Sequence, residues 1–285
     1  MDYTTNAYIA AILLRMWPKA VRPLVHWILP QCRKLRKQVA EARQIVIGII
    51  DRRRKAKAAA EAENRPEPVF NDVIEWFAQD EQEKGSSYDP VVGQLILSQA
   101  AIHTTTDLLT QVMLDIALNP DVVGALRDEV KQVIANHGWT RVALAEMRLV
   151  DSAIKESQRL KPIAQNGTVT RKDNVVGVPV HEMWDSAVHD NPETWDAYRF
   201  YRMSKAGSKD AALTGSTPNH LAWGHGKHAC AGRFFVAQEV KVALAHMLLH
   251  YEWKIAPSSK GIKPLEIGLT LAANPMAKVL VRKVL

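Results

Sequence analysis

The chain has 285 residues, of which 47% are hydrophobic, and it carries a formal net charge of +7. This length and apolar content are enough to bury a substantial core, which excludes disorder as the default interpretation. The two cysteines, Cys32 and Cys230, provide no disulfide framework and are typical of a reducing, cytosol-facing compartment. No nucleic-acid partner is predicted, because no recognition motif accompanies the basic residues.

The first long apolar stretch, residues 7–29, is interrupted by three basic residues and two prolines. It therefore predicts an amphipathic or buried helix in place of a membrane span, with membrane surface contact as an alternative. The polar residues 1–6 do not form a cleavable signal. A basic run at residues 52–57 indicates a solvated helix face, or else a surface for an anionic membrane or an acidic redox partner.

Helical spacing dominates the first half of the chain. The predicted helices are 8–16, 31–62, 71–79, 91–118, 121–136, 141–146 and 147–160. Strand-like runs are few: 168–170, 175–180, and 267–271 paired with 277–282 as a C-terminal hairpin. The pattern predicts a mainly α protein with minor β structure.

The strongest chemical signal is WGHGKHACAGR at residues 223–233, followed by an apolar helical run through residue 249. Two glycines before the cysteine and one after it let the backbone approach something large and flat. A thiolate there is able to ligate haem iron, and a nearby histidine could reach a haem propionate. The helix behind the sulfur adds the positive end of its dipole. The candidate cofactor-binding residues are Trp223, Gly224, Gly226, His228, Cys230 and Gly232.

Two other interpretations of this stretch remain open. One is a glycine-rich turn around a buried cysteine that does no chemistry. The other is a zinc site, although the spacing of its donors matches no common zinc pattern. Its ligands would be His220, His225, His228 and Cys230.

The stretch resembles the cysteine-ligand loop of the cytochrome P-450 family, in which an aromatic residue, glycines, a basic residue, cysteine and glycine stand at fixed offsets. Further segments resemble the same family in the expected order. Residues 156–159 (ESQR) place a carboxylate and a guanidinium on one helix face, and residues 191–200 resemble the family's meander region. The resemblance implies that Glu156, Arg159 and Arg199 form a buried charged network that braces the haem-side scaffold.

Residues 100–105 (AAIHTT) resemble the family's small-small-x-acidic-Thr-Thr pattern over the distal haem face. The resemblance implies room for dioxygen and catalytic roles for His103, Thr104 and Thr105, with a threonine hydroxyl relaying protons. His103 departs from the pattern, since an acidic residue is usual there, and this puts the proton route in doubt. The alternative is that both threonines only fill the core. By family topology, Ala101, both threonines and residues 271–274 face the substrate.

The resemblance covers essentially the whole chain, which corresponds to the C-terminal part of the P-450 fold. It implies one partial domain over residues 1–285, with distal helices at 1–62, a central helix at 91–118 and a haem-binding part at 147–285. We expect a truncation that removes the anchor and early helices, and an internal deletion between Thr170 and Val178. Arg171, beside this deletion, is a candidate propionate contact.

The implied function is a haem-dependent monooxygenase with thiolate ligation through Cys230. Its expected substrate is an apolar small molecule, a fungal secondary-metabolite intermediate of terpenoid, indole-terpenoid or polyketide class. Its expected electron donor is an NADPH-dependent reductase. The family's location is the cytosolic face of the endoplasmic reticulum membrane; without the anchor, we expect a cytosolic or peripheral membrane protein.

Two alternatives to this function stay open. The first is an inactive truncated remnant, because half a cofactor pocket would leave apolar haem edge in water. The second is a cofactor-free membrane-surface interaction module. The module would account for residues 7–29 and the basic helix, but it leaves the cysteine loop unexplained.

Overall fold

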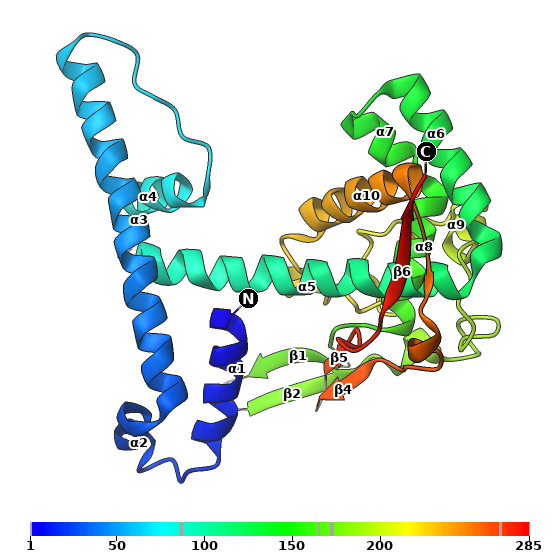
Figure 1. The fold of residues 1–285 in the computed structure, drawn as a ribbon, viewed down its shortest axis with the longest axis horizontal. Helices are drawn as coiled ribbons and strands as arrows, with labels where there is room; N and C mark the ends of the chain where they lie inside the picture. Colours follow the sequence, from blue (N-terminus) through cyan, green and yellow to red (C-terminus); the bar gives the residue numbers. More distant parts are fainter. Residues whose placement is uncertain (1, 86–87, 165, 172–173, 268–269, 285) are drawn as a thin grey trace. The chain divides into compact units, whose positions relative to one another are not determined.

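The structure, a computed structural model, describes residues 2–85, 88–164, 166–171, 174–267 and 270–284. The backbone forms two compact units, residues 1–100 and 101–285, and each is described by itself (Figure 1). Across the described ranges, no helix is long and apolar enough to cross a membrane. The single partial domain expected over residues 1–285 stays a prediction.

The first unit is helical. Its helices are α1 (Asp2–Arg15), α2 (Arg22–Ile28), α3 (Pro30–Ala62), α4 (Val73–Lys84) and the start of α5 (Pro90–Leu118). Both α1 and α2 pack against α3. Asp72 begins α4 by accepting hydrogen bonds from the backbone N–H groups of Ile74 and Glu75, at 3.1 and 3.2 Å. It also accepts a 2.8 Å bond from Arg53, so one carboxylate both caps α4 and joins it to α3.

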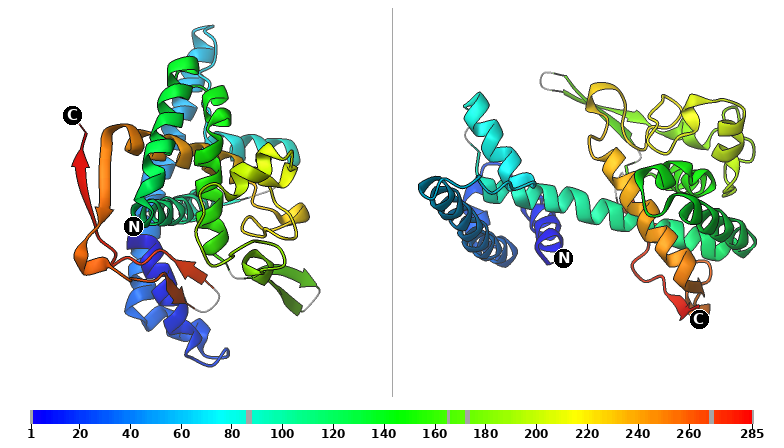
Figure 2. Two further views of the ribbon diagram at one scale, coloured as in Figure 1. Left: turned by 90° about the vertical axis from the view of Figure 1, so that its right-hand side faces the viewer. Right: turned by 90° about the horizontal axis from the view of Figure 1, so that it is seen from above.

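The second unit contains the main core. Its helices are the rest of α5, α6 (Val123–His137), α7 (Arg141–Glu146), α8 (Arg148–Leu160), α9 (Arg199–Lys205) and α10 (Arg233–His250). Single turns of 3₁₀ helix are η1 (Pro120–Val122), η2 (His181–Trp184), η3 (Lys209–Ala211), η4 (Gly226–His228) and η5 (Pro257–Ser259). Helix α10 packs against α6 and α7, and α8 against α6 and α9 (Figure 2). Leu126, Ile154 and Leu244 are fully buried between these helices.

The described strands pair in antiparallel twos. They are β1 (Asn166–Arg171) with β2 (Asn174–Pro179), β3 (Tyr251–Ile255) with β6 (Val279–Lys283), and β4 (Leu265–Ile267) with β5 (Thr270–Ala272). The predicted hairpin between 267–271 and 277–282 is therefore wrong. The segment 270–272 folds back onto its own neighbour, while β6 lies along β3, directly after α10, with Tyr251 opposite Lys283. The sequence interpretation missed β3, as well as α2 and α9 as separate helices.

Candidate cysteine-ligand site

The cysteine loop turns sharply before α10. The backbone N–H of Cys230 donates to the carbonyl of Trp223 at 2.7 Å, which closes the loop. Gly224 and Gly226 have φ of 70° and 66°, in the left-handed region that favours glycine. The indole N–H of Trp223 donates to the carbonyl of Leu213 at 2.7 Å, so the loop is fastened to the chain that precedes it.

The thiol of Cys230 is exposed at the N-terminal end of α10. A Cβ added at Gly224 would lie 3.4 Å from the carbonyl oxygen of His228, so the loop backbone is tightly folded there. A Cβ at Gly232 would lie 3.9 Å from the Cys230 sulfur, at ordinary van der Waals contact. A thiolate-ligated haem requires one accessible cysteine sulfur from the protein. The residues beside Cys230 leave its sulfur uncovered. The residues present therefore fit the group.

The histidines around the loop do not converge on the sulfur. His225 and His228 are exposed, whereas His220 is 3% exposed and its Nε2 lies 3.2 Å from the Oε1 of Gln158. Among the residues that the structure describes, no group of three or more His, Cys, Asp or Glu side chains could hold a metal ion. The zinc alternative therefore has no support. Arg171 ends β1, but its side chain lies outside the described residues.

The central helix α5 and the cysteine loop meet at one small cavity of about 30 Å³. Thr104 of α5 lines it together with Trp223 and Val236. The next residue, Thr105, is instead buried, and its hydroxyl has no hydrogen-bond partner within the described part of the chain. His103 is half-buried on the same helix. Of the three distal candidates, the structure thus brings Thr104 to the cysteine-loop side.

An ion pair beside this cavity escaped the sequence interpretation. Asp107, one turn after Thr104, pairs with Lys161 and accepts a 2.6 Å hydrogen bond from the backbone N–H of Ala273. Lys161 lines the small cavity itself. These contacts hold residues 271–273 beside α5, and the substrate-facing role expected for residues 271–274 stays a prediction. The only sequence signal was an acidic residue one helical turn after Thr104.

Glu156, Arg159 and Arg199 lie together in a buried network. Arg159 donates to both carboxylate oxygens of Glu156 at 2.8 Å, and Arg199 donates to the same oxygens at 3.0 and 3.1 Å. Arg159 also donates to the carbonyls of Met183 and Pro192, both at 2.6 Å. Glu156 and Arg159 are fully buried and Arg199 nearly so, and each charge is satisfied inside the protein.

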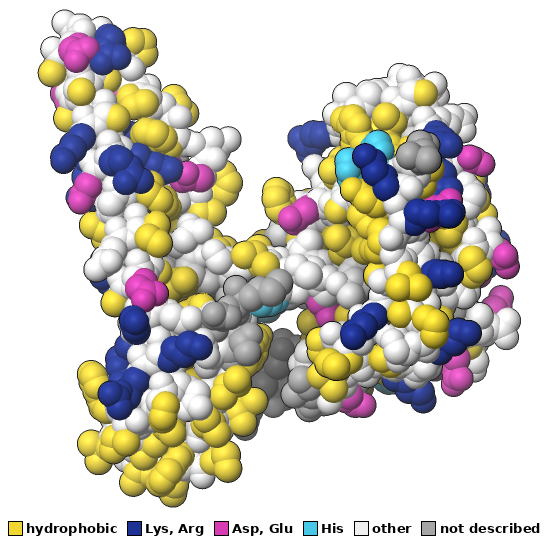
Figure 3. All heavy atoms as spheres, in the orientation of Figure 1, with side chains coloured by type: hydrophobic (Ala, Val, Ile, Leu, Met, Phe, Trp, Pro, Cys, Tyr) yellow, Lys and Arg dark blue, Asp and Glu magenta, His cyan; other side chains and the backbone are white. Residues whose placement is uncertain are grey.

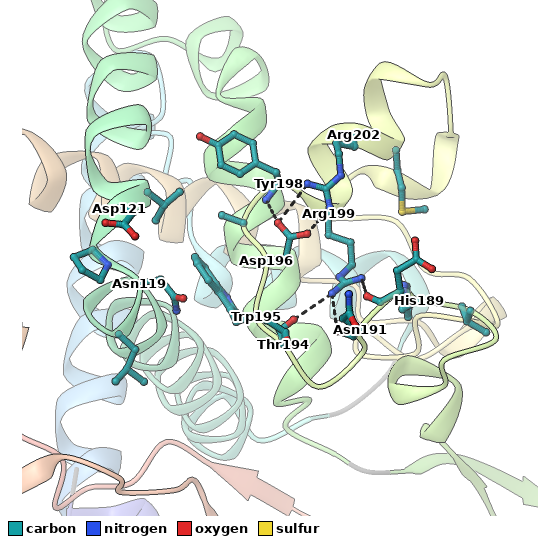
Figure 4. Close-up of a pocket in the computed structure, with 17 residues that line it drawn as sticks. Asn119, Asp121, His189, Asn191, Thr194, Trp195, Asp196, Tyr198, Arg199 and Arg202 are labelled. Atoms are coloured by element: carbon teal, nitrogen blue, oxygen red, sulfur yellow. Dashed lines mark hydrogen bonds and ion pairs between the residues drawn. The ribbon is translucent and has the colours of Figure 1, made fainter.

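The outer side of this network faces a cleft of about 810 Å³ (Figure 4). Arg199 donates there to the carbonyls of Asn191 and Thr194, at 3.2 and 3.1 Å, while Arg202 pairs with Asp196. The arginines therefore tie residues 190–196 into a fixed turn. Cys230 is not among the residues that line the cleft, which is separate from the small cavity at Thr104.

These features define a class: a mainly helical protein that presents one exposed cysteine thiol at the start of a core helix, next to a long central helix. The chain belongs to the cytochrome P450 family, whose family model matches residues 3–280.

Curated relatives from fungi cover nearly the whole chain. It is 40% identical to the cytochrome P450 monooxygenase hepE of Aspergillus oryzae, over 99% of this chain and 54% of that protein. It is 42% identical to cytochrome P450 monooxygenase 1 of Gibberella fujikuroi, over 99% of this chain and 67% of that protein. It is 40% identical to the cytochrome P450 monooxygenase adrA of Penicillium rubens, over 99% of this chain and 58% of that protein. The chain thus spans between 54% and 67% of these relatives.

Proposed function

We propose that this chain is the cysteine-ligand part of a haem-dependent monooxygenase. The observation that carries the proposal is the loop that leaves the sulfur of Cys230 exposed at the start of α10. Haem bound there would supply the activation of dioxygen, with the thiolate donating electron density to iron. Membership of the cytochrome P450 family supports this assignment.

The residues of this chain would then hold, orient and shield. Cys230 would bind iron, and the exposed His228 is the candidate contact for a propionate. Thr104, at the small cavity, would hold a proton on its hydroxyl. The Glu156 network would keep the meander, residues 191–200, in a fixed position and would do no chemistry.

The substrate and electron donor follow from the same proposal. An apolar secondary-metabolite intermediate is supported by the fungal monooxygenases that the chain resembles, among them pyr3 of Aspergillus fumigatus and TRI1 of Fusarium sporotrichioides. The substrate class would be terpenoid, indole-terpenoid or polyketide. An NADPH-dependent reductase would supply the electrons, as membership of the cytochrome P450 family suggests.

The test is the difference absorption spectrum of the reduced, carbon monoxide-bound chain. We expect a Soret band at the thiolate-ligated position in the unaltered chain and in Cys32→Ser, where a buried cysteine is changed as a matched control. We expect the band to disappear in Cys230→Ser. Absence of any haem signal from the unaltered chain, even after reconstitution, would make the chain an inactive remnant and overturn the proposal.

We also propose that the chain contacts an anionic membrane surface through α2 and its connection to α1. Hydrophobic side chains gather over this part of the first unit (Figure 3). Met16, Leu24, Trp27 and Ile28 are 77%, 69%, 61% and 74% exposed. Basic residues lie among them, and cationic, tryptophan-bearing amphipathic segments bind anionic lipid surfaces.

Co-sedimentation with vesicles tests this contact. We expect binding to vesicles that contain phosphatidylserine to exceed binding to neutral vesicles and to survive Cys230→Ser. The double substitution Leu24→Ser and Trp27→Ser should abolish it, because it removes apolar area that would enter the interface. Trp76→Ser, at a tryptophan that is 54% exposed in α4, is the matched control and should bind unchanged. Equal loss in both variants would contradict a contact at α2.

A further inference from the structure

Helix α8 buries polar side chains along two neighbouring stripes. Ser152, Glu156 and Arg159 form the first, and all three bind the segment that contains the meander. The second stripe is displaced by one residue and follows the same i, i+4, i+7 spacing, which places its members on one helix face. It consists of Asp151, Lys155 and Gln158.

The second stripe binds a different segment, residues 210–220. The backbone N–H of Leu213 donates to the Oδ2 of Asp151 at 2.7 Å. Lys155 donates to the carbonyls of residues 210 and 212, at 2.8 and 2.7 Å. The Oε1 of Gln158 lies 3.2 Å from the Nε2 of His220. Three side chains from three successive positions of one face therefore hold the chain that leads into the cysteine loop.

That segment is bonded directly to the loop. The carbonyl of Leu213 accepts the indole N–H of Trp223, whose own carbonyl accepts the backbone N–H of Cys230. Ser216 donates to the carbonyl of Gly224. Two hydrogen bonds in series therefore join residues 210–216 to Cys230. A shift of that segment on α8 would move Trp223 and, through it, the cysteine.

Burying the charged side chain of Lys155 in this position costs free energy. Its side chain is fully buried, and burial lowers its pKa to about 8. Its ammonium lies 5.0 Å from the centre of the Phe200 ring, a favourable cation–π contact. A Cβ at Gly215 would lie 3.0 Å from the carbonyl oxygen of Ala212 and 3.5 Å from the ammonium, so the segment is packed closely onto the lysine. The ammonium is thus held by two carbonyls of the segment and by the Phe200 ring, which fixes where the segment lies on α8.

We infer that Asp151, Lys155 and Gln158 are positioning residues that set the placement of the cysteine loop, and through it the direction in which Cys230 presents its sulfur. The identity of the ligand rests on the proposed function, whereas the positioning of the loop does not. Each stripe of α8 therefore holds a different segment: the first fixes the meander, and the second fixes the cysteine loop.

Amide hydrogen exchange of the haem-free chain, read by mass spectrometry, tests whether the two stripes hold different segments. Lys155→Met should raise exchange in residues 210–232 about tenfold or more, because it removes two charged hydrogen bonds, and should leave residues 183–197, which do not include its ring contact Phe200, protected. Gln158→Leu is the milder variant and should act on the same segment. Lys131→Met, at an exposed lysine of α6, should change neither segment. Arg159→Met should show the reverse pattern and expose residues 183–197.

The haem-bound chain gives a second measurement. In Lys155→Met and Gln158→Leu we expect the haem content to be kept while a larger fraction of the carbon monoxide complex lacks thiolate ligation. Equal exchange in both segments, or unchanged exchange in residues 210–232, would overturn the positioning role. If the unaltered chain binds no haem, the proposed function fails, and the exchange experiment still decides whether the second stripe holds the loop.

Discussion

Arg159→Met is expected to lower the free energy of unfolding by roughly 3–5 kcal/mol, because it leaves the carboxylate of Glu156 buried with one cation in place of two. The carbonyls of Met183 and Pro192 also lose their donor. Methionine fills much of the vacated space. The decrease in the free energy of unfolding therefore reports the unpaired polar groups more than lost packing. Urea unfolding followed by far-ultraviolet circular dichroism measures the change.

Arg202→Met is the matched control for this experiment. Arg202 also pairs with a carboxylate, that of Asp196, but its side chain is 61% exposed. Water and salt screen such a pair, so the change should cost less than about 1 kcal/mol. Losses of similar size in the two variants would show that the Glu156 network contributes no more than a surface ion pair, contrary to the bracing role.

A second large effect is expected from acid at the buried His189. Its side chain is 7% exposed, and burial, together with the charges of Arg159 and Arg199, lowers its pKa to about 4. The unfolded chain takes up the proton near pH 6.5 and the folded chain does not. Stability from this group is therefore complete above pH 6.5 and falls as the pH drops to about 4, by about 3 kcal/mol in total.

The difference between the unaltered chain and His189→Gln isolates this effect. Burial raises the pKa of Asp115 to about 6, and this group favours the folded state as the pH falls, so it opposes the histidine in the total curve. Subtracting the curve of the variant removes the contribution of Asp115. We expect urea unfolding between pH 7 and pH 4 to show a smaller acid loss in the variant. Parallel curves would mean that His189 takes up its proton at the same pH in the folded and the unfolded chain, contrary to the lowered pKa.

His220 should show the same dependence on pH. Burial, with the charge of Lys155 nearby, holds its pKa well below its ordinary value, and its Nδ1 has no partner among the described residues. Its ring and that of His189 both meet the ring of Phe200 edge-on, at 5.7 and 6.1 Å between centroids. The two histidines therefore belong to the same core region as the α8 stripes, and acid should loosen the contacts of that region first.

The sequence by itself was sufficient for the family, and it named Cys230 as the candidate ligand. Chemistry that depends on a few backbone-restricted positions leaves a local signature, and the glycines around Cys230 are such positions. Helical periodicity likewise predicted most of the helices, including α5 and α8, because the apolar positions of a helix recur every three or four residues. Arg199 was joined to Glu156 and Arg159 through the family resemblance alone, since its separation from them along the chain carries no sign of contact.

Only the tertiary structure decided which polar residues act together. Asp151, Lys155 and Gln158 read as ordinary charged or polar positions of an amphipathic helix. Their partners are backbone groups, a histidine and, for Asp151, the ammonium of Lys241, all far away along the chain. Strand pairing was decided in the same way. The residues of β6 favour a strand, but they do not indicate whether its partner is β3 or β5. Local sequence specifies what a segment is able to form, whereas packing selects its partner, because the alternatives differ only in contacts that exist once the chain has folded.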